Sequence, residues 1–113
     1  MHEMSLCESV LQILEQQARV QNFTRVTKVQ LEIGVFACVE PEAMRFGFAA
    51  VTTGTVAEGA RLDIIRVSGE AWCLTCNRLV PVRARVDACP ACGHELLSPK
   101  GGDELRIKQL EVA

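Results

Sequence analysis

The chain has 113 residues and is 49% hydrophobic, which allows one modest core with a small appended module. Only 4% of the residues are aromatic, so aliphatic side chains must supply most of that core. The formal net charge of −2 disfavours a dedicated nucleic-acid binder, because such proteins usually carry a basic excess.

The sequence shows no basic start followed by an apolar run, as a signal peptide would, and no apolar run long enough to span a bilayer. We therefore expect a cytosolic protein. Thiols stay reduced in the cytosol, so clustered cysteines there indicate metal ligands or redox groups rather than disulfides.

The first expected element is a helix that begins at a capping box. Ser5 would be the N-cap, Glu8 would reach back to it from the third helical position, and the helix would end near Val20. With this start, residues 1–4 would form a short arm ahead of the helix. The side chains at helical spacing would form one buried stripe made of Leu6, Val10, Ile13, Leu14 and Ala18.

Three segments alternate between apolar and polar side chains, the pattern of a half-buried strand. They cover residues 26–35, 61–68 and 104–112. A second helix is expected over 41–53, because Pro41 suits a first helical turn. These elements predict an α/β fold in which a three-stranded sheet carries two helices.

A different kind of sequence separates the last two strands. Residues 71–99 hold four paired cysteines and show little periodicity, so this stretch needs a metal ion to fold. We interpret it as an inserted, small zinc-ribbon-like module. The expected domains are an α/β domain over 1–70 completed by 103–113, and a zinc-binding domain over 71–100.

The cysteine spacing predicts one metal site with four thiolate ligands. The ligands would be Cys73, Cys76, Cys89 and Cys92, in two CxxC pairs separated by twelve residues. Asn77 and Gly93 follow the pairs, and both residue types tolerate the positive φ that such turns require. Four thiolates leave no position open for water or substrate, so the zinc would be structural.

Two other interpretations of the cysteines stay open. A redox pair of the thioredoxin type would need a single CxxC at a helix start. A rubredoxin-like iron site would use similar turns but surrounds its iron with aromatic side chains, and only Trp72 is available in this stretch.

The N-terminus offers a second set of metal donors. The bulky His2 should prevent removal of Met1, so the free amine would stay next to the histidine. The amine, the His2 backbone nitrogen and the imidazole can form fused chelate rings, which suit square-planar nickel(II) or copper(II). Glu3 could add its backbone nitrogen or its carboxylate. A histidine near a terminus is, however, usually just solvated.

Several motifs together resemble one known family. The opening Met1-His2-Glu3, the strand Val29–Gly34, the Glu40-Pro41 turn and the CxxC–x12–CxxC insertion occur in this order. The combination is similar to the HypA/HybF family of nickel metallochaperones for [NiFe]-hydrogenase maturation, and it covers essentially the whole chain.

The resemblance implies that the nickel histidine falls on His2, with Glu3 beside it and an acidic residue near the nickel at Glu40. It implies structural zinc on the four cysteines and nickel as transient cargo. The implied partners are a HypB-like GTPase and the hydrogenase large-subunit precursor, with homodimerisation also conceivable. Some relatives carry a histidine after a zinc cysteine, where this chain has Asn77 and Gly93, so ligand switching of that kind is not expected here.

Other polar and sulfur-bearing residues have simpler interpretations. Glu40 suits a helix N-terminus, Cys7 and Cys38 are expected to be buried small apolar groups, and His94 is expected to be solvated. The arginines of the zinc module should form a solvated face: Arg78, Arg83 and Arg85.

The sequence favours a carrier over an enzyme, since we find no nucleophile–base pair, phosphate loop or open metal site. Two rival functions remain. One is a zinc-ribbon nucleic-acid module, which the slightly basic insertion permits weakly. The other is a structural zinc adaptor in which His2 has no role.

Overall fold

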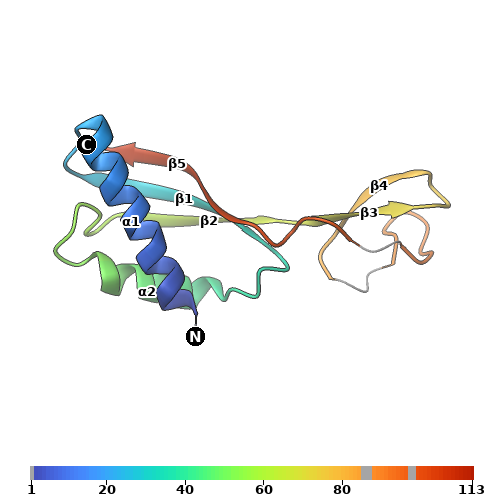
Figure 1. Cartoon of the computed structure of the whole chain (residues 1–113). Helices are drawn as coiled ribbons and strands as arrows, with labels where there is room; N and C mark the ends of the chain where they lie inside the picture. The colour runs from blue at the N-terminus through green and yellow to red at the C-terminus, as the bar shows by residue number, and fades with distance from the viewer. Residues whose placement is uncertain (1, 85–87, 97–98) are drawn as a thin grey trace. The chain divides into compact units, whose positions relative to one another are not determined.

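The computed structural model describes residues 2–84, 88–96 and 99–113 (Figure 1). The elements follow in the order α1 (Glu3–Gln21), β1 (Val26–Gly34), α2 (Pro41–Thr52), β2 (Arg61–Val67), β3 (Gly69–Cys73), β4 (Arg78–Val82) and β5 (Leu105–Val112). The strands form a three-stranded sheet in the order β2-β1-β5 and a separate two-stranded sheet, β3-β4.

The chain divides into two compact units. The helical unit consists of Met1–Leu31, Val39–Ile64 and Ile107–Ala113. The cysteine unit consists of Glu32–Cys38 and Ile65–Arg106. The predicted α/β fold and the predicted positions of β1, α2, β2 and β5 are confirmed.

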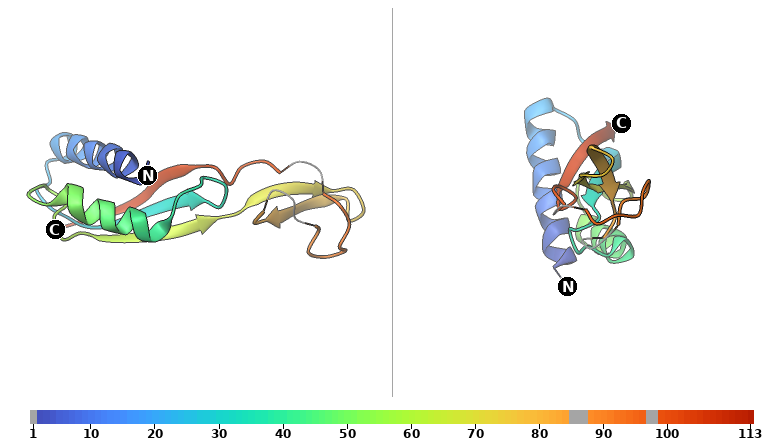
Figure 2. Two further views of the ribbon diagram at one scale, coloured as in Figure 1. Left: turned by 90° about the horizontal axis from the view of Figure 1, so that it is seen from below. Right: turned by 90° about the vertical axis from the view of Figure 1, so that its right-hand side faces the viewer.

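The core of the helical unit lies between the two helices and one face of the sheet (Figure 2). Val29 and Leu31 of β1 are fully buried, as the alternating pattern predicted. The helices approach closely at Gly47, where a Cβ atom would lie 2.9 Å from the sulfur of Met4 and 3.2 Å from that of Cys7. A larger residue at this position would therefore push the helices apart.

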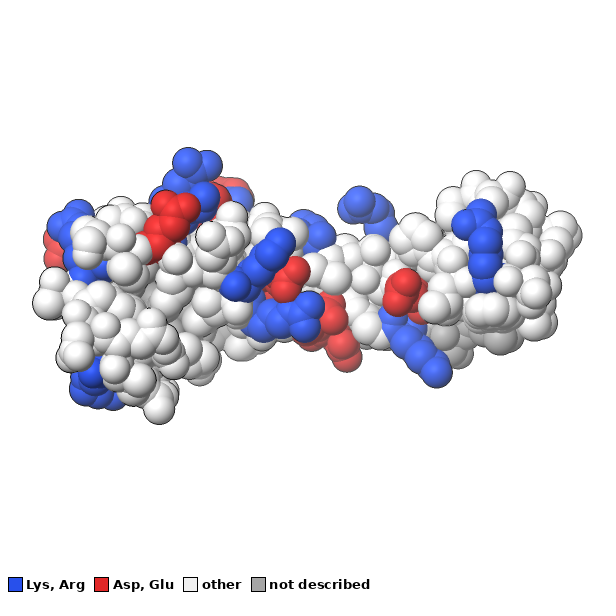
Figure 3. All heavy atoms as spheres, turned by 90° about the horizontal axis from the view of Figure 1, so that it is seen from above, with Lys and Arg blue, Asp and Glu red and all other residues white. Residues whose placement is uncertain are grey.

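The other face of the sheet carries ion pairs. Lys28 lies 3.4 Å from the carboxylate of Asp63 and 3.5 Å from that of Glu111, so it joins three strands. On the face shown in Figure 3, basic and acidic side chains are interleaved rather than gathered by sign. None of the helices among the described residues is both long and apolar enough to cross a membrane.

The start of α1 differs from the prediction. The helix begins at Glu3, with His2 as N-cap, so Ser5 lies inside the helix and the predicted capping box is wrong. The expected arm of residues 1–4 is wrong for the described part of that segment, because the amide of Leu6 donates to the carbonyl of His2 at 3.0 Å. The side chain of the N-cap residue His2 makes no capping hydrogen bond.

The predicted buried stripe of α1 is only partly correct. Val10 and Leu14 are buried as expected, whereas Ile13 is 47% exposed. Glu3 and Cys7 occupy the buried face instead. The buried face of α1 therefore includes one carboxylate and one thiol. The spacing of apolar residues alone does not detect such polar members of a buried face.

The cysteine unit contains a very close backbone contact. The amide of Gly34 donates to the carbonyl of Glu104 at 2.7 Å, and the amide of Phe36 donates to that of Gly102 at 2.5 Å. A Cβ atom on Gly34 would lie 2.0 Å from the Gly102 oxygen. Only glycine permits these two segments to pair.

We expect Gly34→Ala to lower the free energy of unfolding by about 2 kcal/mol or more, because backbone atoms cannot move aside as a flexible side chain can. Gly54→Asn is the control, since Gly54 has a φ of 78° with no atom near its Cβ position, and asparagine tolerates this conformation. Urea unfolding followed by circular dichroism measures both. Equal losses in the two variants would contradict the steric argument.

Candidate metal centres

Four cysteine sulfurs converge in the cysteine unit. The Sγ atoms of Cys73, Cys76, Cys89 and Cys92 all lie within 4.8 Å of one another. The sulfurs of Cys73 and Cys92 are 3.5 Å apart, and those of Cys76 and Cys89 are 3.8 Å apart. A tetrahedral ion with metal–sulfur bonds of about 2.3 Å needs sulfur–sulfur separations of about 3.8 Å. The spacing of the sulfurs therefore fits one tetrahedral metal ion.

Each CxxC pair forms the turn that such a site requires. In the first, the amide of Asn77 donates to the carbonyl of Cys73 at 2.7 Å, and the amide of Cys76 points to the Cys73 sulfur at 3.4 Å. In the second, the amide of Gly93 donates to the carbonyl of Cys89 at 2.8 Å. The positive φ values predicted for both following residues are confirmed, at 56° for Asn77 and 76° for Gly93.

The thiols of the cluster do not ionise independently. Burial opposes ionisation of Cys89, but hydrogen bonds from the amides of Cys92 and Ala91 and from neighbouring thiols outweigh it and lower its pKa to about 6. Hydrogen bonding to Cys92, together with burial, raises the pKa of Cys76 to about 12. Close sulfurs cannot all carry negative charge unless a cation neutralises them, so the donor set fits a divalent metal ion.

The surroundings of the cluster are apolar. Cys73 and Cys89 are buried together with Val80, and Leu96 packs against them. His94 is exposed, as predicted, and its backbone carbonyl accepts the amide hydrogen of Cys89 at 2.9 Å. Within the described residues the site therefore offers only sulfur ligands.

The two cysteines outside the cluster differ from each other. Cys7 is fully buried, as predicted, and its thiol donates to the carbonyl of Met44 at 3.3 Å. Cys38 is exposed, so the prediction that it is buried is wrong. It has a φ of 56° and directly follows the turn after β1, in which the amide of Ala37 donates to the carbonyl of Gly34 at 3.0 Å.

The second candidate centre lies where the two helices begin. The amide of Glu40 donates to the carboxylate of Glu3 at 3.2 Å, and Glu3 is only 7% exposed. Glu40 is the N-cap of α2, and its carboxylate accepts the amide hydrogen of Glu42 at 3.3 Å. The fold thus brings Glu3 and Glu40 together, and the exposed His2 directly precedes Glu3 in the chain.

The carboxylate of Glu3 is held in its charged form. Hydrogen bonds, among them those from the amides of Glu40 and Glu3, lower its pKa to about 2. Sequence reasoning missed this buried, bridging role, because the contact joins residues 37 positions apart and has no local signature. Met1, whose amine is a predicted donor, lies outside the described residues.

Known proteins share both the sequence and the architecture. Residues 1–112 match the family model described as "Hydrogenase/urease nickel incorporation, metallochaperone, hypA". The chain belongs to the HypA family. It is 56% identical to "Hydrogenase maturation factor HypA" from Azotobacter vinelandii and 59% identical to that from Alkalilimnicola ehrlichii, in each case over 112 residues and 99% of both chains. The family resemblance noted in the sequence is therefore confirmed.

Solved structures agree on the fold. The solution structure of the nickel metallochaperone HypA from Helicobacter pylori superposes with a TM-score of 0.68 at 23% identity, covering 99% of this chain and 97% of that one. A second solution structure of a HypA protein gives a TM-score of 0.69 at 22% identity, covering 100% and 97%. At these identities the likeness supports the fold alone.

We expect Cys92→Ala to abolish the bound metal and loosen the cysteine unit, because three thiolates cannot complete the tetrahedron around which this unit packs. Cys38→Ala is the matched control, since Cys38 is an exposed cysteine outside the cluster. Native mass spectrometry counts the ion, and X-ray absorption reports its ligands. Two or more nitrogen neighbours on the metal, or full metal content in Cys92→Ala, would contradict the four-sulfur site.

Proposed function

We propose that this protein is a nickel carrier that binds Ni(II) at its N-terminus and delivers it for insertion into a [NiFe]-hydrogenase large subunit. The proposed donors are the amine of Met1 and the backbone nitrogen and imidazole of His2. The observation that carries the proposal is the hydrogen bond from the Glu40 amide to the carboxylate of Glu3, the residue that follows His2, in a chain of the HypA family.

The helical position of His2 favours chelation by backbone nitrogens. The first amides of an α-helix have no acceptor within the helix. Because His2 is the N-cap of α1, its amide belongs to this group. Its nitrogen can bind an ion without the loss of a helical hydrogen bond, whereas the His2 carbonyl is already engaged by Leu6.

The two carboxylates supply charge for this site. A helix N-terminus disfavours a cation, since its dipole points the positive end there. The negative charges of Glu3 and Glu40 oppose that effect. The Glu3 carboxylate is occupied by the amide of Glu40 and is buried, so we assign Glu3 to the nickel through its backbone nitrogen rather than through its side chain.

We assign zinc, in a structural role, to the four-cysteine cluster. An iron site of the rubredoxin kind would be expected to have aromatic side chains around it. Trp72, the single tryptophan, pairs with Leu79 across the β3–β4 hairpin. It alternates with the buried Ala71 and Cys73, so it lies on the opposite face of the hairpin from the cysteine cluster. This arrangement favours zinc.

The carrier has a small, exposed ligand set that can pass its ion to a stronger site, and we propose no enzymatic step. We assign the nickel-binding domain to residues 1–70 with 103–113 and the zinc-binding domain to 71–100. The expected partners are a HypB-like GTPase and the hydrogenase large-subunit precursor. The cytosolic location expected from the sequence remains a prediction, as does the lack of a nucleic-acid partner, which a binding assay at moderate salt would test.

His2→Ala should abolish tight nickel binding, because it removes the imidazole from the chelate. A tag fused ahead of Met1 should do the same while leaving every side chain unchanged. The matched control is His94→Ala, since His94 is the other histidine and is exposed. Nickel titration of the zinc-loaded protein, followed by d–d absorption, measures all three. Tight binding by the tagged protein would show that the amine is not a ligand.

Nickel affinity should fall as the pH is lowered from about 8 to about 5, because protons compete with the ion for the proposed nitrogen donors. Glu3 should not contribute to this loss, because its pKa of about 2 keeps its carboxylate charged throughout this range. Nickel titrations at pH values from about 5 to about 8, spaced by about one unit, would measure how the affinity depends on pH. An affinity that changed only below about pH 4.5, the range of an ordinary carboxyl group, would instead point to carboxylate ligands.

Glu40→Gln should weaken nickel binding a few-fold, since it removes the charge but retains an oxygen that can cap α2. Glu40→Ala should weaken binding similarly and also lower the thermal stability, because it removes the cap as well. Parallel nickel titrations and thermal melts separate the two effects. Unchanged nickel affinity in Glu40→Gln would limit Glu40 to helix capping.

A further inference from the structure

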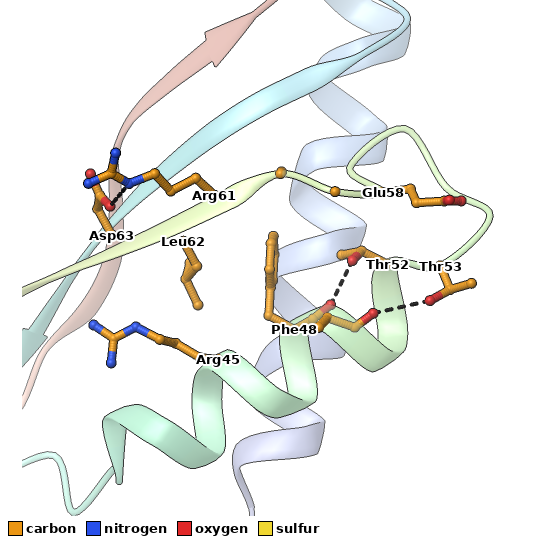
Figure 4. A pocket seen from close by; sticks show the side chains of 11 residues that line it. Arg45, Phe48, Thr52, Thr53, Glu58, Arg61, Leu62 and Asp63 are labelled. Carbon is orange, nitrogen blue, oxygen red and sulfur yellow. Dashed lines mark hydrogen bonds and ion pairs between the residues drawn. The ribbon is translucent and has the colours of Figure 1, made fainter.

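A hollow of about 610 Å3 lies between α2 and the start of β2, within the helical unit (Figure 4). Its lining comes from one side of α2, the loop before β2 and the first residues of β2. These residues are Arg45, Phe48, Ala49, Thr52, Thr53 and 58–63. None of them belongs to the proposed nickel or zinc sites.

The hollow follows the outer edge of β2. Leu62 points toward α2, whereas Arg61 and Asp63 lie on the other side of the strand (Figure 4). Side chains from both faces of a strand can line one hollow only where the hollow runs along the strand's edge. β2 is an outer strand of the sheet, and no described strand pairs with its free side.

A free strand edge presents unpaired amide and carbonyl groups, which bind another extended chain well. Beside this edge the hollow has an apolar floor. Phe48 is 2% exposed and Leu62 is 9% exposed, and they come from opposite sides of the hollow. An aliphatic side chain of an added strand would contact both.

The charges at the hollow favour an acidic ligand. The carboxylate of Asp63 is already bound by Arg61 at 2.7 Å and by Lys28 at 3.4 Å. The carboxylate of Glu58 accepts the amide hydrogen of Gly54 at 2.6 Å. The acidic groups are thus engaged.

Arg45 can bind an incoming carboxylate at a small cost in free energy. Its ion pair is with Glu42 of its own helix, on the surface, where such pairs exchange easily. The arginine can therefore turn toward an incoming carboxylate at the edge of the hollow.

We propose that the β2 edge and this hollow form a docking site for an extended segment of a partner protein, which adds a strand beside β2. The segment would place an aliphatic side chain over Phe48 and Leu62 and an acidic side chain against Arg45. Residues i and i+2 of a strand are about 6.7 Å apart on one face, close to the rise of about 6 Å along α2 from Arg45 to Ala49. The expected recognition pattern is acidic–any–aliphatic.

The test begins with a phage-displayed library of random peptides selected against the zinc-loaded protein. We expect the enriched peptides to share the acidic–any–aliphatic pattern. Synthetic peptides with the enriched sequence should bind in calorimetry, and N-methylation of alternate backbone amides should weaken binding at least tenfold, because strand addition needs those hydrogen bonds.

Two variants locate the site. Arg45→Glu should weaken peptide binding at least tenfold by charge reversal, and Ala49→Trp should block it by filling the hollow from an exposed helical position. Arg19→Glu, an exposed arginine on the other helix, is the matched control and should bind normally. Circular dichroism confirms that each variant is folded.

Three results would overturn the proposal. The enriched peptides could lack the pattern, or they could bind Arg45→Glu and Ala49→Trp as well as the original protein. Sedimentation could also show a dimer that Ala49→Trp dissociates, which would make a second copy of the chain the occupant.

Discussion

The hydrogen bond from the Glu40 amide to the Glu3 carboxylate joins the beginnings of both helices, and the proposed nickel site depends on it. It places a buried, charged carboxylate at the N-terminal end of α1 and fixes the position from which His2 projects. It also satisfies an amide that precedes the first turn of α2. One contact thus sets the helix start, the local charge and the spacing between Glu3 and Glu40.

The cysteine unit depends on a different constraint. Its buried side chains are few, and the four sulfurs form much of its interior. Such a small unit cannot be stable through apolar burial alone, and a bound ion supplies the missing free energy. The residues after each CxxC pair adopt positive φ, which lets the turns close around the ion. The same tight coordination explains why this site suits a structural metal and not a metal to be handed over.

A metal carrier requires one site that retains its ion and another that can release it, and the two candidate centres differ in this respect. The cysteine site is enclosed and has four sulfur donors, so its ion should stay. The proposed N-terminal site would have few donors, at an exposed histidine with charge supplied by neighbouring carboxylates, so an ion bound there could leave. The membership of the HypA family is consistent with this division between a resident and a transported metal.

The sequence by itself determined the three strands of the larger sheet, the second helix, the four-cysteine site and its turns, but not the strands β3 and β4. These features depend on local periodicity and on ligand spacing, which are readable along the chain. Only the tertiary structure decided where α1 begins, that Glu3 is buried, and that Cys38 is exposed. A capping box at Ser5 is a local preference of about 1 kcal/mol, and it loses to a helix extension that lets Glu3 bind the amide of Glu40. Contacts between residues far apart in the sequence decide where a helix begins in such cases, and local sequence patterns do not show these contacts.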